Sequence, residues 1–225
     1  MDQLTLRTTT ADLPPHSDQD RDPVDSLSSG IGILDGFNYA DADLRALDLD
    51  DLKLLNGTVR GVRTESATWT KLRIDSVEFT GCELSSLRLS DSKLTRVRFT
   101  NCKLLGADLE EVTAEHVVFD HCKLDYATLT GLRAKGPMIF TGTVLREARF
   151  TRCDLGRALF DGCDLALAEF DQGTYKCCDL RGNDLSTLRG VTNLRGVRIE
   201  QAQSLHLAEA LIAELGIDID GDDRP

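Results

Sequence analysis

A five-residue spacing of apolar residues runs through most of the chain and constrains its fold more than any other feature. Counting in steps of five from Leu34, every position up to Val144 is apolar except Thr64. After one step of six, the spacing resumes at Phe150 and continues to Leu185. An α-helix repeats every 3.6 residues and a β-strand every two, so neither element explains the pattern. The spacing predicts a chain that turns a corner every five residues.

A second, smaller residue lies two positions before most of these apolar residues, and it also points inward in this interpretation. Phe79, Phe99 and Phe119 are 20 residues apart. Like residues therefore recur after four sides of five, which predicts a square coil of stacked turns. Cys177 falls on an outward position. The small inward position holds six of the seven cysteines, which we expect to be reduced core thiols: Cys82, Cys102, Cys122, Cys153, Cys163 and Cys178.

The repeats resemble those of the pentapeptide-repeat family, whose pattern is alanine, then aspartate or asparagine, then leucine and two variable residues. Ala42-Asp43-Leu44, Ala107-Asp108-Leu109 and Cys153-Asp154-Leu155 carry the resemblance. It covers residues 34–199. It implies an all-β solenoid, a right-handed quadrilateral β-helix of about eight coils at the strand spacing of ~4.8 Å. Such a solenoid needs a cap at its open end.

The two ends of the chain differ from the repeats and define three regions: 1–33, 34–200 and 201–225. Residues 1–33 contain Pro14, Pro15 and Pro23 and six acidic against two basic residues. We expect a flexible acidic extension there, with an arm that binds a partner as the alternative. Residues 201–215 change to a helical spacing that ends at Gly216.

The C-terminal helix has two interpretations. It only caps the last coil, or it caps with one face and pairs with a second subunit through the other. The tail resembles that of mycobacterial fluoroquinolone-resistance members of the family, which implies a homodimer through the C-terminal helices. The expected dimer interface consists of Leu205, Leu207, Ala208, Leu211, Ile212 and Leu215.

Composition and motifs disfavour several function classes. No apolar run reaches the roughly 20 residues of a membrane helix, and residues 1–30 lack the apolar stretch of a signal peptide. With the reduced cysteines, this predicts a cytoplasmic protein. His116 and His121 fall on outward positions without a ligand set around them. No nucleophile, phosphate loop or metal motif is present, so we expect no enzyme, no cofactor and no metal.

Binding remains, and two hypotheses stay open. In the first, which the resemblance implies, the rod imitates DNA, binds DNA gyrase or another type II topoisomerase and protects it from quinolones or natural gyrase poisons, without binding nucleic acid itself. The second is a scaffold for an unrelated regulatory partner. It rests on the basic column of Arg73, Lys93 and Arg133 and on the small net charge of the repeats, −3 from 26 acidic and 23 basic residues in 34–200. The DNA-mimic hypothesis places partner binding at the C-terminal coils, on Asp154, Asp161, Asp164, Glu169, Asp171, Asp179 and Asp184.

Overall fold

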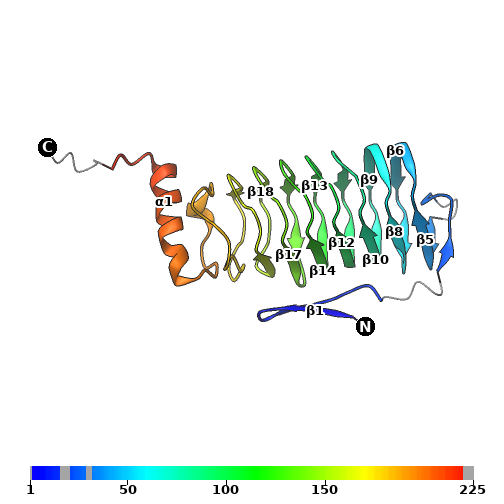
Figure 1. The fold of residues 1–225 in the computed structure, drawn as a ribbon, viewed down its shortest axis with the longest axis horizontal. Coiled ribbons are helices and arrows are strands. Elements are labelled where there is room, and N and C mark those ends of the chain that lie inside the picture. Colours follow the sequence, from blue (N-terminus) through cyan, green and yellow to red (C-terminus); the bar gives the residue numbers. More distant parts are fainter. Residues whose placement is uncertain (1, 16–20, 29–31, 220–225) are drawn as a thin grey trace.

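The computed structural model describes residues 2–15, 21–28 and 32–219, and it shows a solenoid of parallel strands with about seven turns and a C-terminal helix (Figure 1). Strands pair with the strands one turn earlier and one turn later, as in Phe79↔Phe99 and Phe99↔Phe119. The fold class predicted from the five-residue spacing is confirmed. The number of turns, about seven, is close to the roughly eight coils expected.

Each turn has four sides, and each face of the rod is named here after one residue that points into the core from it. In chain order these are the Trp69 face, the Ile74 face, the Phe79 face and the Leu84 face. The Trp69 face and the first turns of the Leu84 face form one sheet, and isolated bridges such as Glu83↔Lys103 continue the Leu84 face. This sheet contains β6 (Asp43–Asp50), β9 (Arg63–Thr70), β11 (Arg88–Ser90), β13 (Asp108–Glu110), β15 (Thr128–Thr130), β18 (Arg149–Thr151) and β20 (Glu169–Asp171).

The Ile74 and Phe79 faces form the larger sheet. Its long strands bend at a corner residue, for example Ser76 (φ 57°) in β10 and Arg96 (φ 49°) in β12, so that one strand supplies both faces. The sheet contains β3 (Asp22–Pro23), β4 (Ile33–Asp35), β5 (Phe37–Ala40), β7 (Lys53–Leu55), β8 (Thr58–Arg60), β10 (Arg73–Thr80), β12 (Lys93–Thr100), β14 (Thr113–Asp120), β16 (Arg133–Ala134), β17 (Met138–Thr141) and β19 (Ala158–Asp161).

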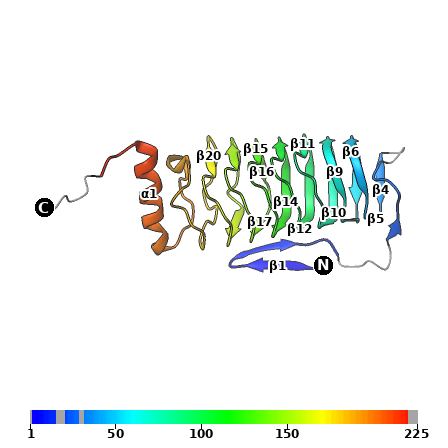
Figure 2. The ribbon, with the colours of Figure 1, turned by 45° about the horizontal axis from the view of Figure 1, so that its top comes forward.

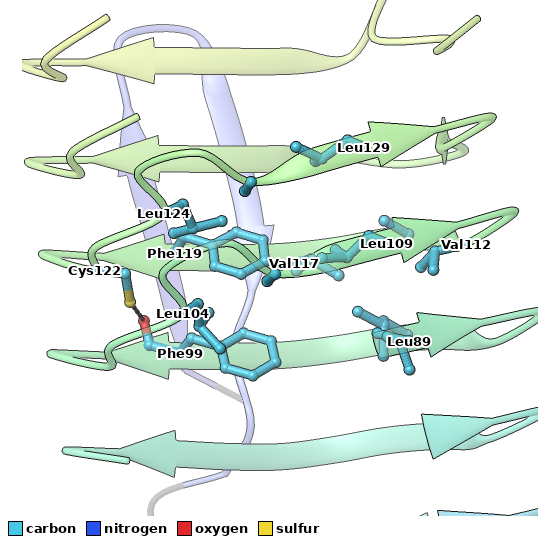
Figure 3. Close-up of a cluster of buried hydrophobic side chains, with 14 of the residues drawn as sticks. Leu89, Phe99, Leu104, Leu109, Val112, Val117, Phe119, Cys122, Leu124 and Leu129 are labelled. Atoms are coloured by element: carbon cyan, nitrogen blue, oxygen red, sulfur yellow. Dashed lines mark hydrogen bonds between the residues drawn. The ribbon is translucent and has the colours of Figure 1, made fainter. Parts of the chain in front are cut away.

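The core consists of columns of like side chains, one per turn (Figure 3). Phenylalanine rings stack along the Phe79 face with centroids 4.7–5.0 Å apart, and the column contains Phe79, Phe99, Phe119, Phe140 and Phe160. Five of the six buried thiols donate to carbonyls of the preceding turn, as from Cys122 Sγ to the Phe99 oxygen at 3.4 Å. Six cysteines are buried free thiols and Cys177 is exposed, which confirms their predicted positions.

The one-residue insertion lies earlier than the sequence spacing placed it. Ala134 pairs with Ala114, 20 residues away, whereas Phe140 pairs with Phe119, 21 residues away. The extra residue is therefore between Ala134 and Phe140, at the corner that contains Gly136 and Pro137, and not between Val144 and Phe150. The assignment of Ile139 to the inward column was wrong, because Phe140 takes that place.

The expectation of little structure before residue 34 is wrong for the described part of that region. Strands β1 (Gln3–Leu6) and β2 (Thr9–Asp12) form an antiparallel hairpin. The hairpin lies alongside the rod in both views (Figures 1 and 2). After it, β3 pairs in parallel with β5, and Leu27 is fully buried in the main core. Residues before 34 thus begin the solenoid and cover one of its faces.

The C-terminal helix α1 (Ser204–Leu215) follows two short 3₁₀ helices, η1 (Val191–Asn193) and η2 (Gln201–Gln203). Leu207 and Ala210 of α1 face the coil, and polar side chains of η2 and α1 add hydrogen bonds to the last turns. Gln203 is buried and donates to the carbonyls of Leu180 (2.9 Å) and Asn183 (2.7 Å). Glu214 accepts a hydrogen bond from the Val191 backbone at 2.7 Å. Gly216, in the left-handed conformation (φ 63°), ends the helix as the sequence predicts.

Candidate functional surfaces

The described residues contain no group of three or more histidine, cysteine, aspartate or glutamate side chains placed to hold a metal ion. Among them, no helix is long and apolar enough to cross a membrane. The inward positions are filled by the side-chain columns described above. Recognition by this rod therefore depends on outward side chains, and the arrangement of those side chains by face decides what it can bind.

The acidic residues predicted to bind a partner do not gather on one surface. Strand register distributes them over all four faces of the last turns. Glu169 and Asp171 lie on the Trp69 face and Asp154 on the Ile74 face. Asp161 and Asp179 lie on the Phe79 face, and Asp164 and Asp184 on the Leu84 face. A flat partner that contacts one side of the rod would reach only two or three of them.

Asp179 is the least available of this set, because it is buried and paired. Its carboxylate accepts hydrogen bonds from Arg181 Nε at 2.9 Å and from Arg7 Nη1 at 3.3 Å. Burial acts to raise the pKa of Asp179, but the hydrogen bonds from Arg181 outweigh it and hold that pKa below its usual value. While Arg7 and Arg181 hold its carboxylate, Asp179 is not available to a partner.

Three other members of the set are also occupied by local partners. Asp164 accepts from Arg146 Nε at 2.6 Å, and Asp161 from Arg7 Nη2 at 2.6 Å. Asp184 is exposed and accepts from the backbone N–H of Ser186 at 2.9 Å, and this bond lowers the pKa of Asp184. These carboxylates keep part of their charge exposed, but each already neutralises or orders a neighbour.

The largest acidic surface is instead the Trp69 face, which the sequence interpretation did not single out. We count each corner residue with the face that it ends. The bases on this face are Lys71, Arg88, Arg149, Arg152 and Arg189. The nine acids are Asp48, Asp50, Asp51, Asp91, Asp108, Glu110, Glu111, Glu169 and Asp171.

Most of these acids are free to contact a partner. All are exposed except Glu169 and Asp171, which are half-buried. Glu111 pairs with Arg133, and Glu169 lies 3.6 Å from Arg149. Within the described residues, no cation lies at salt-bridge distance from Asp48, Asp50 or Asp108. The column of Asp50, Thr70, Ser90, Glu110, Thr130, Thr151 and Asp171 carries acids and hydroxyl groups and no base.

The neighbouring Ile74 face has the opposite sign. Its acids between residues 53 and 176 are Asp75, Glu115 and Asp154. Its eight bases are Lys53, Arg73, Lys93, Arg96, Arg133, Lys135, Arg157 and Lys176. The predicted basic column of Arg73, Lys93 and Arg133 is confirmed and gains Lys53, which pairs with Arg73. Only Thr113 interrupts it.

A shallow groove of about 680 Å³ follows the corner between these two faces. Arg73, Lys93 and Arg133 line one wall, and Asp51, Asp91 and Glu111 line the other. The small net charge of the repeats therefore results from two adjacent faces of opposite sign, whose charges largely cancel in the sum. Sorting the charges by position within the 20-residue turn reveals the separation, whereas counting them along the chain averages over all four faces.

The helix residues predicted to form a dimer interface lie mostly on the outer side of α1. Leu205 is 70% exposed and Leu215 58% exposed, and Ala208 and Leu211 are exposed as well. Ile212 is half-buried, and Leu207 packs against the main core. The apolar row of Leu205, Leu211 and Leu215 is exposed and does not plug the coil. Ala210, Leu207 and Gln203 face the coil, so the apolar row is left to solvent.

Comparisons with known proteins agree with this architecture. Residues 62–129 match the profile described as "Pentapeptide repeat region", and residues 139–166 match "Pentapeptide repeats (8 copies)". A search of curated proteins found no match. The solved structure of full-length QnrB1, described as a plasmid-mediated fluoroquinolone resistance protein, has a TM-score of 0.50 and 20% identity, and the alignment covers 77% of this chain and 99% of that one.

A second solved structure is HetL, described as a pentapeptide repeat protein involved in heterocyst differentiation regulation, from the cyanobacterium Nostoc. It aligns with a TM-score of 0.33 and 19% identity, over 74% of this chain and 86% of that one. At these identities the likeness to QnrB1 supports the fold alone, and the likeness to HetL carries no argument.

Proposed function

Since the chain is a pentapeptide-repeat protein whose recognition groups are outward side chains, we propose that it is a non-enzymatic, cytoplasmic binding protein. Its partner is a type II topoisomerase such as DNA gyrase, which it protects from quinolones or natural gyrase poisons by occupying the surface that binds DNA. The observation that carries this proposal is the Trp69 face, where nine acids and five bases share one side of a straight rod. Such a face complements the cationic surface that a topoisomerase offers to phosphates.

The repeats have a small net charge and a basic column, which argue against a DNA mimic. The separation of acids and bases onto different faces removes this difficulty. Of the 23 bases in residues 34–200, eight lie on the Ile74 face, a corner away from the acidic columns, and there they outnumber the acids. A protein docked on the Trp69 face meets the acids first. The bases around the corner lie near the edge of the contact, where salt screens them over about 10 Å.

Inhibition of gyrase supercoiling by two variants with equal charge changes tests this function. The test variant carries Asp48→Asn, Asp50→Asn, Asp108→Asn and Glu110→Gln, all on the Trp69 face. The control removes four acids elsewhere, by Glu147→Gln, Asp154→Asn, Asp164→Asn and Asp184→Asn. We expect the test variant to need at least ten times more protein for half-inhibition, and the control less than three times more.

Two outcomes contradict the proposal. Equal loss in the two variants would show that inhibition follows net charge and not a face. No inhibition by the unmodified protein would exclude gyrase as the partner. We also expect inhibition by the unmodified protein to weaken as salt rises from 50 to 200 mM, because the attraction is electrostatic.

The basic column favours a second function, a scaffold for an acidic regulatory protein. Lys53, Arg73, Lys93 and Arg133 are exposed and stand within four turns of one another on the Ile74 face. The reversal variant Arg73→Glu with Lys93→Glu separates the two functions. Unchanged inhibition of gyrase places the topoisomerase contact elsewhere, whereas loss of binding to polyglutamate in the same variant supports a second, anionic partner.

A further inference from the structure

Three neighbouring outward positions of the Phe79 face are apolar, unlike most outward positions of the rod. Val118 in β14, Ile139 in β17 and Leu159 in β19 stand in register, one turn apart. All three are fully buried, because the β1–β2 hairpin covers them. They form a cluster with the hairpin that is separate from the main core inside the coil.

The hairpin contacts this strip with one side of its strands. Ala11 and Leu13 are buried against it, and Leu4 and Leu6 pack there partly exposed. β1 and β2 pair only with each other among the described strands. The hydrogen bonds that Arg7 and Asp12 of the hairpin make to the coil each involve a side chain, as from the Asp12 backbone N–H to His116 Nδ1 at 2.9 Å. The hairpin thus packs on the sheet and does not pair with its strands.

Arg7, at the hairpin turn, adds a charged contact to the apolar one. Its Nη2 donates to Asp161 Oδ1 at 2.6 Å and to the Arg181 carbonyl at 2.8 Å, and its Nη1 donates to Asp179 Oδ1 at 3.3 Å. The covered surface therefore accepts a short β-hairpin that combines apolar side chains with one arginine.

The coil does not depend on the hairpin for its own hydrogen bonds. Asp179 keeps two hydrogen bonds from the Arg181 guanidinium when Arg7 leaves. The phenylalanine column behind the strip belongs to the main core and packs on the inner side of the same strands. Removal of the hairpin would expose the three apolar side chains and two carboxylates and leave the coil intact.

We propose that this strip of Val118, Ile139 and Leu159, with Asp161 and Asp179 at its edge, is a binding site for a partner's β-hairpin that carries an arginine beside apolar residues. The chain's own hairpin occupies the site in the free protein and competes with the partner's hairpin. This site is on a different face from the one assigned to the topoisomerase, and its test requires no topoisomerase.

The experiment uses the full chain and a fluorescent peptide with the sequence of residues 2–13. An opened variant carries Leu6→Asp and Arg7→Glu, which remove an apolar contact and reverse the charge at the carboxylates. We expect it to bind the peptide at least ten times more tightly than the unmodified chain, where the intact hairpin competes. A peptide with Arg7→Glu should bind the opened variant at least ten times more weakly than the native peptide.

A control variant and three possible results test the proposal further. The Arg88→Glu variant makes the same charge reversal on the Trp69 face and should bind the peptide no better than the unmodified chain. The proposal is wrong if the opened variant binds no better than the unmodified chain, or if both peptides bind it equally. It is also wrong if the opened variant fails to fold, as judged by its circular dichroism, since the hairpin would then be an obligatory part of the fold.

Discussion

At the scale of single residues, the columns inside the coil explain how a chain with only 5% aromatic residues fills its core. Phe99 lies between Phe79 and Phe119, with ring planes tilted by 11° and 4°. Each ring thereby fills the space between two others, and the same geometry repeats at every turn. A substitution in the middle of a column therefore disturbs the packing of both neighbouring turns.

Phe99→Ala is therefore expected to lower the free energy of unfolding by about 3–5 kcal/mol, the cost of a large cavity in a close-packed core. Arg88→Ala on the same turn is the control. Arg88 is exposed, and its loss should cost less than about 0.5 kcal/mol. Urea denaturation followed by circular dichroism measures both. Similar losses at the two positions would contradict the column.

The paired carboxylates predict how stability depends on pH. Arg181 lowers the pKa of Asp179 against the effect of burial, and Arg98 does the same for Asp120. Because these pKa values are lower in the folded state, their contribution is complete above about pH 4, the unfolded value. It is lost as pH falls through the folded pKa values. The urea midpoint should thus stay level from pH 6 to 5 and fall below pH 4, and a midpoint that rises on acidification would refute the assignment.

At the scale of elements, α1 is attached by Leu207 and Ala210, which face the coil, and by the buried Gln203 of the preceding η2, and not by the row of Leu205 and Leu215. Gln203 satisfies two carbonyls of the last turns, and its own Oε1 accepts from the Glu200 backbone at 2.7 Å. The last turn has no following strand to pair with. The Gln203 side chain therefore donates to backbone carbonyls that the N–H groups of a further turn would otherwise satisfy.

Gln203→Ala should consequently release α1 before the coil unfolds. Its removal leaves buried backbone groups without partners, at about 1–3 kcal/mol. We expect hydrogen exchange of the α1 amides to speed up about tenfold or more, while the exchange of β12 and β14 amides stays unchanged. Gln201→Ala, at an exposed position of η2, is the control. Equal exchange in all three proteins would contradict this role.

At the scale of the whole molecule, the exposed apolar row of α1 predicts a homodimer that joins two rods at their C-terminal ends. Leu205 and Leu215 are among the most exposed large apolar side chains described, and burial against a second copy removes them from water. The interface differs from the sequence expectation in one respect. Leu207 packs on its own coil and is not available to the partner.

Leu205→Glu with Leu215→Glu should accordingly convert a dimer into a monomer in sedimentation equilibrium at micromolar concentration. Leu105→Glu introduces a charge at an exposed leucine of the Leu84 face and should leave the dimer intact. An unmodified protein that sediments as a monomer would exclude the dimer directly.

The sequence by itself determined the solenoid, because a period of five with a longer period of 20 is satisfied by one arrangement of inward side chains. It also determined that six thiols are inside and Cys177 outside, and that a helix with a glycine stop ends the rod. These features follow from local spacing, which each repeat carries in full. The insertion was misplaced because Ile139 and Phe140 are both apolar, and only pairing with Phe119 shows which of them is inward.

Tertiary structure alone decided which surfaces exist. Charges one turn apart lie about 5 Å apart on one face, whereas charges next to each other in sequence point to different faces. Arg7 is 154 residues from Asp161 in sequence, yet the two form an ion pair. The hairpin site and the outward row of α1 depend on such long-range neighbours. No count of charges or apolar residues along the chain contains that information, since it arises only when the turns are stacked.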